Sequence, residues 1–110
     1  MTVSENTGNT QTATISTEHT LATITTAGTY QLLVELTNMV DGDELELRIK
    51  VKGRSGSTSR VLFFQTYKHA QGADAIVAIS PPVPAPFEFV ATLKQTAGTG
   101  RNFVWSIYQY

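Results

Sequence analysis

The segment from Leu45 to Lys52 constrains the fold of this chain more than any other part of the sequence. Apolar and charged residues alternate through it without a break, in the order Leu45, Glu46, Leu47, Arg48, Ile49, Lys50, Val51 and Lys52. Side chains of a β-strand point alternately to its two faces, whereas a helix would spread these charges around its circumference. The segment is therefore predicted to be an antiparallel strand with one face on a core and the other in water.

The rest of the chain repeats this kind of signal at short intervals. Further strands are expected from about Gln11 to Thr17 and at 21–26, 29–38, 60–67, 75–79, 87–94 and 102–110. Turns or loops rich in glycine or aspartate separate them at 40–44, 53–58, 68–74 and 97–100, and an extended connection that holds all four prolines is expected at 80–86. No segment has a helical period. The sequence therefore predicts a single all-β domain, an antiparallel, jelly-roll-like β-sandwich of about eight strands.

The first residues of the chain differ from the rest because they are small and polar. Residues 1–12 lack the apolar side chains that offset the entropy lost on ordering. We expect a flexible, extended N-terminal arm at 1–12, followed by the β-sandwich domain at 13–110. An arm that becomes ordered on a partner subunit is the alternative.

Composition excludes several classes of function. The chain has no cysteine, so it has neither a disulfide framework nor thiolate metal sites. Its formal net charge is −1, which provides no basic field for nucleic acid or an anionic membrane. No apolar run approaches the length of a membrane span, and no charged-then-apolar leader opens the chain. We expect neither nucleic acid nor membrane as a partner.

Residues that could carry chemistry are few and scattered. His19 and His69 stand fifty positions apart without the spacing of metal ligands, so they are interpreted as ordinary loop residues. The acidic cluster at 41–44 suits a tight turn better than a calcium loop. The segment 98–101 lacks the rest of a phosphate-binding loop and is interpreted as a hairpin turn. We therefore predict no catalytic residue, no metal site and no cofactor, and a protein that is not an enzyme.

Two strands carry more large apolar residues than one core needs. The run at 61–64 and the last strand are apolar or aromatic on both faces, which indicates a surface that contacts a partner. The candidate interface residues are Phe64, Val104, Tyr108 and Tyr110, together with Thr7 and Thr10 of the arm. The equally weighted alternative is that the arm or the proline-rich segment of the same chain covers these strands.

Three segments resemble small virion proteins of tailed bacteriophages. They read AGTYQL at 27–32, DGDELELR at 41–48 and TLKQTAGTGR at 92–101, the last continuing to Trp105. The similarity extends over most of the chain from about Thr20 onward and consists of turn and strand chemistry. The family comprises small all-β structural proteins, including capsid decoration (cement) proteins with jelly-roll-like folds, which are often trimeric. The resemblance contains no functional constellation, so it implies no site residue.

The resemblance implies a homotrimeric head decoration protein that binds the major capsid protein and stabilises contacts between capsid subunits. Such a protein is made in the host cytoplasm and lies on the capsid surface of the virion. The alternative is a receptor- or carbohydrate-binding module of the tail or fibre, because aromatic rings stack on sugars. The rings available for this are Tyr67, Trp105, Tyr108 and Tyr110. Trp105 alternates in phase with Phe103 and Ile107, which favours a place in the core.

Overall fold

Nine β-strands make up most of the chain that the computed structural model describes, residues 3–72 and 76–110. They are β1 (Ser4–Thr12), β2 (Glu18–Ile24), β3 (Gly28–Glu35), β4 (Glu44–Val51), β5 (Arg60–Lys68), β6 (Val77–Ile79), β7 (Val83–Ala85), β8 (Phe89–Ala97) and β9 (Asn102–Gln109). These described residues include no helix, and so none that could cross a membrane. The predicted all-β class is confirmed. The expected loop at 68–74 and strand at 75–79 fall partly outside the described residues.

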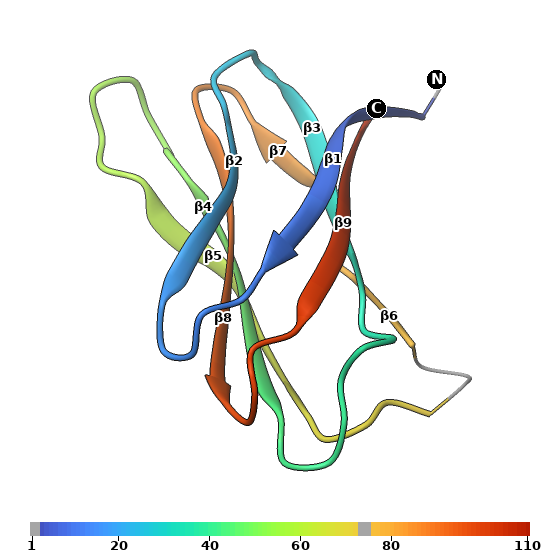
Figure 1. The fold of residues 1–110 in the computed structure, drawn as a ribbon. Coiled ribbons are helices and arrows are strands. Elements are labelled where there is room, and N and C mark those ends of the chain that lie inside the picture. The colour runs from blue at the N-terminus through green and yellow to red at the C-terminus, as the bar shows by residue number, and fades with distance from the viewer. Residues whose placement is uncertain (1–2, 73–75) are drawn as a thin grey trace.

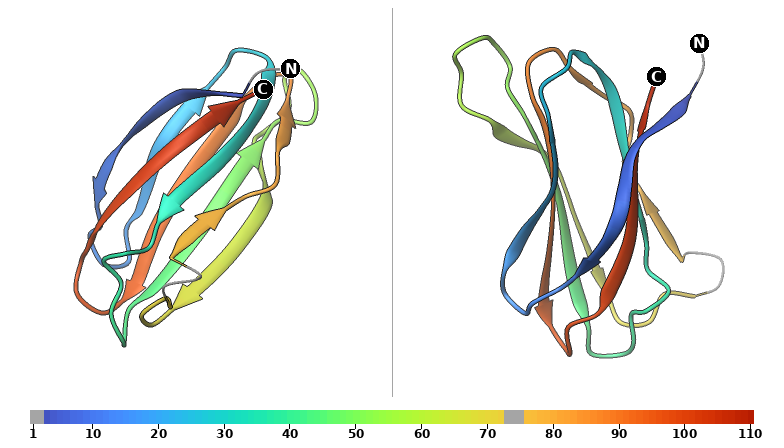
Figure 2. Two further views of the ribbon diagram at one scale, coloured as in Figure 1. Left: turned by 90° about the vertical axis from the view of Figure 1, so that its right-hand side faces the viewer. Right: turned by 45° about the horizontal axis from the view of Figure 1, so that its top comes forward.

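The strands form two antiparallel sheets that pack face to face (Figures 1 and 2). Sheet A has the order β1-β9-β3-β6, with β7 also paired to β3, and sheet B has the order β2-β8-β4-β5. The pairs are nested: β1 pairs with β9, β2 with β8, β3 with β6 and β7, and β4 with β5. This nesting is the arrangement of a jelly roll, in which a folded-over hairpin of strands closes into two sheets.

Strands β6 and β7 are two halves of one interrupted strand. Pro81 and Pro82 lie between them and have no N–H with which to continue the ladder along β3. The side chain of Ser80 replaces part of the missing pairing, because its Oγ accepts the N–H of Leu32 at 3.0 Å. The backbone N–H of Ser80 donates to the carbonyl of Leu32 at 2.9 Å. The described residues therefore form eight jelly-roll strands with one divided in two, which agrees with the predicted number of about eight, although β7 lies in the segment 80–86 that was expected to be a connection.

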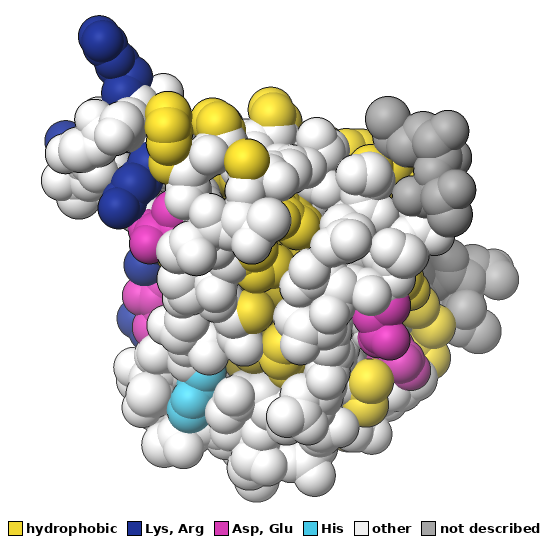
Figure 3. Space-filling model, turned by 90° about the horizontal axis from the view of Figure 1, so that it is seen from above, with side chains coloured by type: hydrophobic (Ala, Val, Ile, Leu, Met, Phe, Trp, Pro, Cys, Tyr) yellow, Lys and Arg dark blue, Asp and Glu magenta, His cyan; other side chains and the backbone are white. Residues whose placement is uncertain are grey.

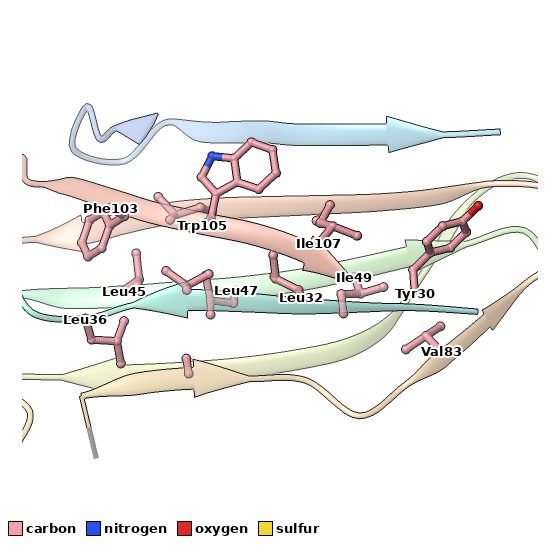
Figure 4. Close-up of a cluster of buried hydrophobic side chains, with 14 of the residues drawn as sticks. Tyr30, Leu32, Leu36, Leu45, Leu47, Ile49, Val83, Phe103, Trp105 and Ile107 are labelled. Atoms are coloured by element: carbon pink, nitrogen blue, oxygen red, sulfur yellow. The ribbon is translucent and has the colours of Figure 1, made fainter. Parts of the chain in front are cut away.

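The core fills the space between the inner faces of the two sheets (Figure 4). The inward residues of β3, β4 and β9 include Leu32, Leu47 and Ile107, each at most 2% exposed. The rings of Tyr30 and Phe89 pack with their centroids 5.3 Å apart, and the Tyr30 hydroxyl donates to the carbonyl of Thr26 at 2.6 Å. Trp105 is only 5% exposed and belongs to this core, as its phase on the strand predicted.

The N-terminal segment corrects two expectations. Residues 4–12 are not a flexible arm but the edge strand β1, paired with β9 from Ser4↔Gln109 to Thr12↔Asn102. The expected strand from Gln11 to Thr17 is instead a turn after Thr12, in which Ser16 has a φ of 65°. The reason is that an edge strand is held by backbone hydrogen bonds to its neighbour, which need no apolar side chains.

Candidate interaction surfaces

The predicted interface residues are divided between the two outer faces of the sandwich. Val104 and Tyr108 alternate with the buried residues of β9 and therefore point away from the core on sheet A. Thr10 lies opposite Val104 on β1, and Tyr110 follows β9 with its N–H donated to Thr29. These four residues share one face.

The other two predicted residues lie elsewhere. Phe64 is on the outer face of sheet B, opposite Arg48 of β4. Thr7 of β1 is paired with the core residue Ile107 and faces the inner side of sheet A, half-buried. The six residues therefore do not form one site.

Neither the N-terminal segment nor the proline-rich segment covers the outer face of sheet A. Strand β1 lies beside β9, and β7 lies beside β3, so both extend the sheet within its own plane. The alternative in which these segments shield the outward residues is therefore wrong for the residues of β1 and β7.

The outer face of sheet A carries an apolar group that we call patch A, made of Leu33, Val77, Ile79 and Val104. Leu33 of β3 pairs with Ile79 of β6, and the next outward pair is Glu35 with Val77. Ile79 is 53% exposed, Val77 44% and Val104 41%, whereas Leu33 is half-buried. Sequence reasoning named only Val104, because the register that aligns β3, β6 and β9 depends on distant parts of the chain.

A more polar shelf continues the same face toward the C-terminus. The Tyr110 hydroxyl donates to Gln31 Oε1, and Gln31 Nε2 donates to the carbonyl of Ser80 at 2.7 Å. Tyr108 lies opposite Gln31 in the sheet. The shelf therefore combines two tyrosine rings with an amide whose orientation is fixed by hydrogen bonds.

The outer face of sheet B carries a second apolar group, patch B, made of Val61, Leu62 and Phe64 of β5. A bulge between Ile49 and Lys50 leaves Leu62 without an opposite residue on β4. Leu62 is 57% exposed and Phe64 49%. The guanidinium carbon of Arg48 lies 4.7 Å from the centroid of the Phe64 ring, a cation–π contact. Within the described residues, β5 pairs with β4 alone, so its second edge is open.

The two sheets differ in charge. The strands of sheet A contain Glu5 and Glu35 and no lysine or arginine. Those of sheet B contain five cations and three carboxylates, namely Arg48, Lys50, Arg60, Lys68, Lys94, Glu18, Glu44 and Glu46. Figure 3, a view onto the end that carries both termini, shows the dark blue side chains on one side of the molecule and acidic side chains without them on the other. Sheet A is therefore acidic and sheet B is basic.

Ion pairs along sheet B bring all three of its strand carboxylates beside cations. Glu46 lies 2.9 Å from Arg48, and Glu18 lies 3.0 Å from Lys50. The excess of positive charge rests on Arg60 and Lys94, neither of which forms an ion pair with a described residue.

The acidic residues at 41–44 interact with different partners and form no common site. Asp43 is 1% exposed and accepts the Arg101 Nε–H at 2.9 Å and the Val40 N–H at 3.0 Å. Burial alone would raise the pKa of Asp43, but these hydrogen bonds outweigh it and hold the pKa below its ordinary value. Glu44 instead lies 3.5 Å from Lys68. The turn predicted at Asp41-Gly42 is present, with Gly42 at a φ of 97°.

Gln95 was not recognised as a structural residue in the sequence. It is fully buried, and its amide nitrogen donates to the carbonyls of Ala97 and Thr99 at 3.0 and 2.8 Å. Its amide oxygen accepts the N–H of Arg101 at 3.0 Å. Gln95 thereby fixes the hairpin turn predicted at 98–101, which also presents Arg101 to Asp43.

The two histidines hold turns through their ring nitrogens. His19 Nε2 accepts the Thr14 N–H, and His69 Nδ1 accepts the Gly42 N–H, each at 3.0 Å. They lie at opposite edges of sheet B, on β2 and just after β5, and within the part of the chain that the structure describes no three metal-ligating side chains come together. No enclosed pocket is present there either, so the candidate surfaces are the open faces of the two sheets.

Comparison with known proteins supports the fold. The chain matches no family model and no curated protein. Among solved structures it is similar to PirA, with 13% sequence identity and a TM-score of 0.57, over 94% of this chain and 93% of that one. At this identity the likeness extends to the β-sandwich fold alone.

Proposed function

We propose that this protein is a structural component of a phage particle, a homo-oligomeric head decoration protein that binds the capsid surface. Patch A is the observation that carries this proposal. Its apolar side chains lie on a sheet face that neither β1 nor β7 covers. Contiguous exposed apolar residues on a folded domain are typical of surfaces that bind other proteins.

The assignment to a phage particle is supported by the sequence resemblance at 27–32, 41–48 and 92–105. The fold is compatible with it, since jelly rolls occur in viral capsid proteins and also in lectins. A fold hosts many functions, so the surface rather than the fold must decide between them. A decoration protein acts through contacts and needs no catalytic group.

The test is co-sedimentation with capsids of the phage that encodes the chain, after its small virion proteins have been stripped off. We expect the protein to bind in a fixed ratio to the major capsid protein and to protect the shell against heat. Ile79→Asp should abolish binding, whereas Val40→Asp, an exposed valine of the β3–β4 loop outside both patches, should bind like the wild type. Absence of wild-type binding would refute the proposal.

A second candidate, a glycan-binding module of the tail or fibre, is favoured by the polar shelf. Rings of Tyr108 and Tyr110 beside the oriented amide of Gln31 combine stacking surfaces with hydrogen-bonding groups, as sugar sites require. Trp105 and Tyr67 do not contribute, because Trp105 is buried and Tyr67 packs against the core.

Glycan-array binding separates the two candidates. The glycan-binding module predicts a signal that Tyr108→Ala and Tyr110→Ala each reduce and that Thr66→Ala, on the other sheet, leaves unchanged. An array without signal removes the second candidate and leaves the first.

A further inference from the structure

We propose that patch A of one copy binds patch B of a second copy, so that the protein assembles head to tail through two different surfaces. The inference deepens the proposed function, because it names the contact through which a decoration protein would oligomerise. It rests on the exposure, the charge and the position of the two patches.

Both patches are apolar and uncovered in the single chain. Patch A presents Ile79, Val77 and Val104, and patch B presents Leu62, Val61 and Phe64, each between 41% and 57% exposed. Burying either group against water-exposed polar surface would gain little, whereas burying one against the other removes apolar area from water on both sides.

The charges around the patches are complementary. Glu35 borders patch A, paired in the sheet with Val77, and no strand of sheet A contains a cation. Arg48 lies opposite Phe64 and Lys50 opposite Val61 on the outer face of sheet B, so two cations lie beside patch B. A contact between the acidic face of one copy and the basic face of the next brings opposite charges together at its rim.

The same charges disfavour the two symmetrical alternatives. A contact between two copies of patch A would bring together two sheets whose charged strand residues are all carboxylates. Antiparallel pairing of two β5 edges centred on Phe64 would place Arg60 of one copy opposite Lys68 of the other, and like charges directly opposite each other destabilise paired strands. The head-to-tail contact avoids both conflicts.

The position of the patches favours an open, stacked assembly. β5 and β6 are the last strands of their sheets and lie on the same side of the sandwich, away from β1 and β2 (Figure 2). A heterologous contact forms a ring when its rotation closes and an open filament when it does not. Patch A and patch B lie on the outer faces of different sheets and point away from each other, so successive copies stack face to face, and the last copy of the stack keeps its patch A free for the capsid.

The experiment measures mass in solution by size-exclusion chromatography with light scattering. We expect the wild type to form an oligomer larger than a dimer, and Ile79→Asp and Leu62→Asp each to be monomeric. A mixture of the two variants should form heterodimers and nothing larger, because the pair retains one intact patch A and one intact patch B. Val40→Asp should assemble like the wild type.

Several results would overturn the inference: a monomeric wild type at about 100 μM, either variant still forming the wild-type oligomer, or a variant mixture that stays monomeric. Thermal unfolding confirms that each variant is folded. If a patch variant is unfolded, Glu35→Lys replaces Ile79→Asp and Lys50→Glu replaces Leu62→Asp. Each should weaken association by about tenfold or more at low salt, a change of about 1.4 kcal/mol, and an unchanged association would count against the contact.

Failure of this inference is distinguishable from failure of the proposed function. Assembly in solution without capsid binding would leave the contact between copies standing and refute the decoration role. Capsid binding by a protein that remains monomeric would do the reverse.

Discussion

The hairpin turn between β8 and β9 buries polar side chains, whereas the outer face of sheet A exposes apolar ones. At the turn, the buried polar side chains of Asp43 and Gln95 have their hydrogen bonds satisfied inside the protein. On the face, apolar side chains such as Ile79 lie in water without a partner. Satisfied buried polar groups specify one conformation, whereas exposed apolar groups add nothing to it. The turn therefore maintains the structure, and the face remains available for contacts.

The largest expected effect is that of Gly98→Ala on stability. Gly98 has a φ of 90°, and a Cβ there would collide with the Asp43 carboxylate and lie 3.0 Å from the Asp43 Cα. We expect the free energy of unfolding to fall by about 3 kcal/mol. Gly53→Ala is the control, because its Cβ would meet nothing within 4 Å. Equal denaturation midpoints for the two variants would contradict the assigned role of the turn.

Gln95→Leu should have the next largest effect. The substitution keeps the side-chain volume roughly constant but leaves the Arg101 N–H and two carbonyls without their partner, for a loss of about 2 kcal/mol. Gln65→Leu, on an exposed position of β5, should change stability by less than about 0.5 kcal/mol. Chemical denaturation measures both. If Gln95→Leu were as stable as Gln65→Leu, the hydrogen bonds of the Gln95 amide would not stabilise the turn.

The buried carboxylate of Asp43 should make the turn sensitive to acid. Its pKa is lower in the folded chain than in the unfolded chain, so its stabilising contribution is complete above the ordinary pKa near 3.8. This contribution is lost as the pH falls through the folded-state value. Asp43→Asn should lower stability at neutral pH by about 1–2 kcal/mol and flatten the decline at acid pH. Parallel wild-type and Asp43→Asn stability curves between pH 5 and 2 would be the contrary result; Asp41→Asn provides the matched control.

The smallest expected effect on stability belongs to Val104→Ser on the outer face of sheet A. Since the side chain is exposed, the free energy of unfolding should change by no more than about 0.5 kcal/mol. Association between copies should nevertheless weaken severalfold, as measured by light scattering over a dilution series. A large loss of stability would show that the outer face of sheet A supports the fold, as the β8–β9 turn does, and is not free for contacts.

The sequence allowed the fold class, most strand positions and the turns to be predicted, because alternation and turn chemistry are local signals. The stretch Leu45–Lys52 is the clearest case, since it matches β4 (Glu44–Val51) to within one residue at each end. Strand β1 escaped prediction because an edge strand of polar residues has no hydrophobic pattern. Patch A could not be predicted from the sequence for a different reason. Leu33, Ile79 and Val104 come together only through a register between strands distant in sequence.

The nested pairing of the strands has a consequence for the order in which the chain folds. Ser4 pairs with Gln109, so β1 has no partner until almost the whole chain has been synthesised. The hairpin of β4 and β5 needs only local closure and is available much earlier. Because pairings of high sequence separation form slowly, joining of β1 to β9 should be among the last events of folding. The polar composition of β1 is then an advantage during synthesis. Because the unpaired segment exposes few apolar side chains, it is less prone to aggregate with other chains.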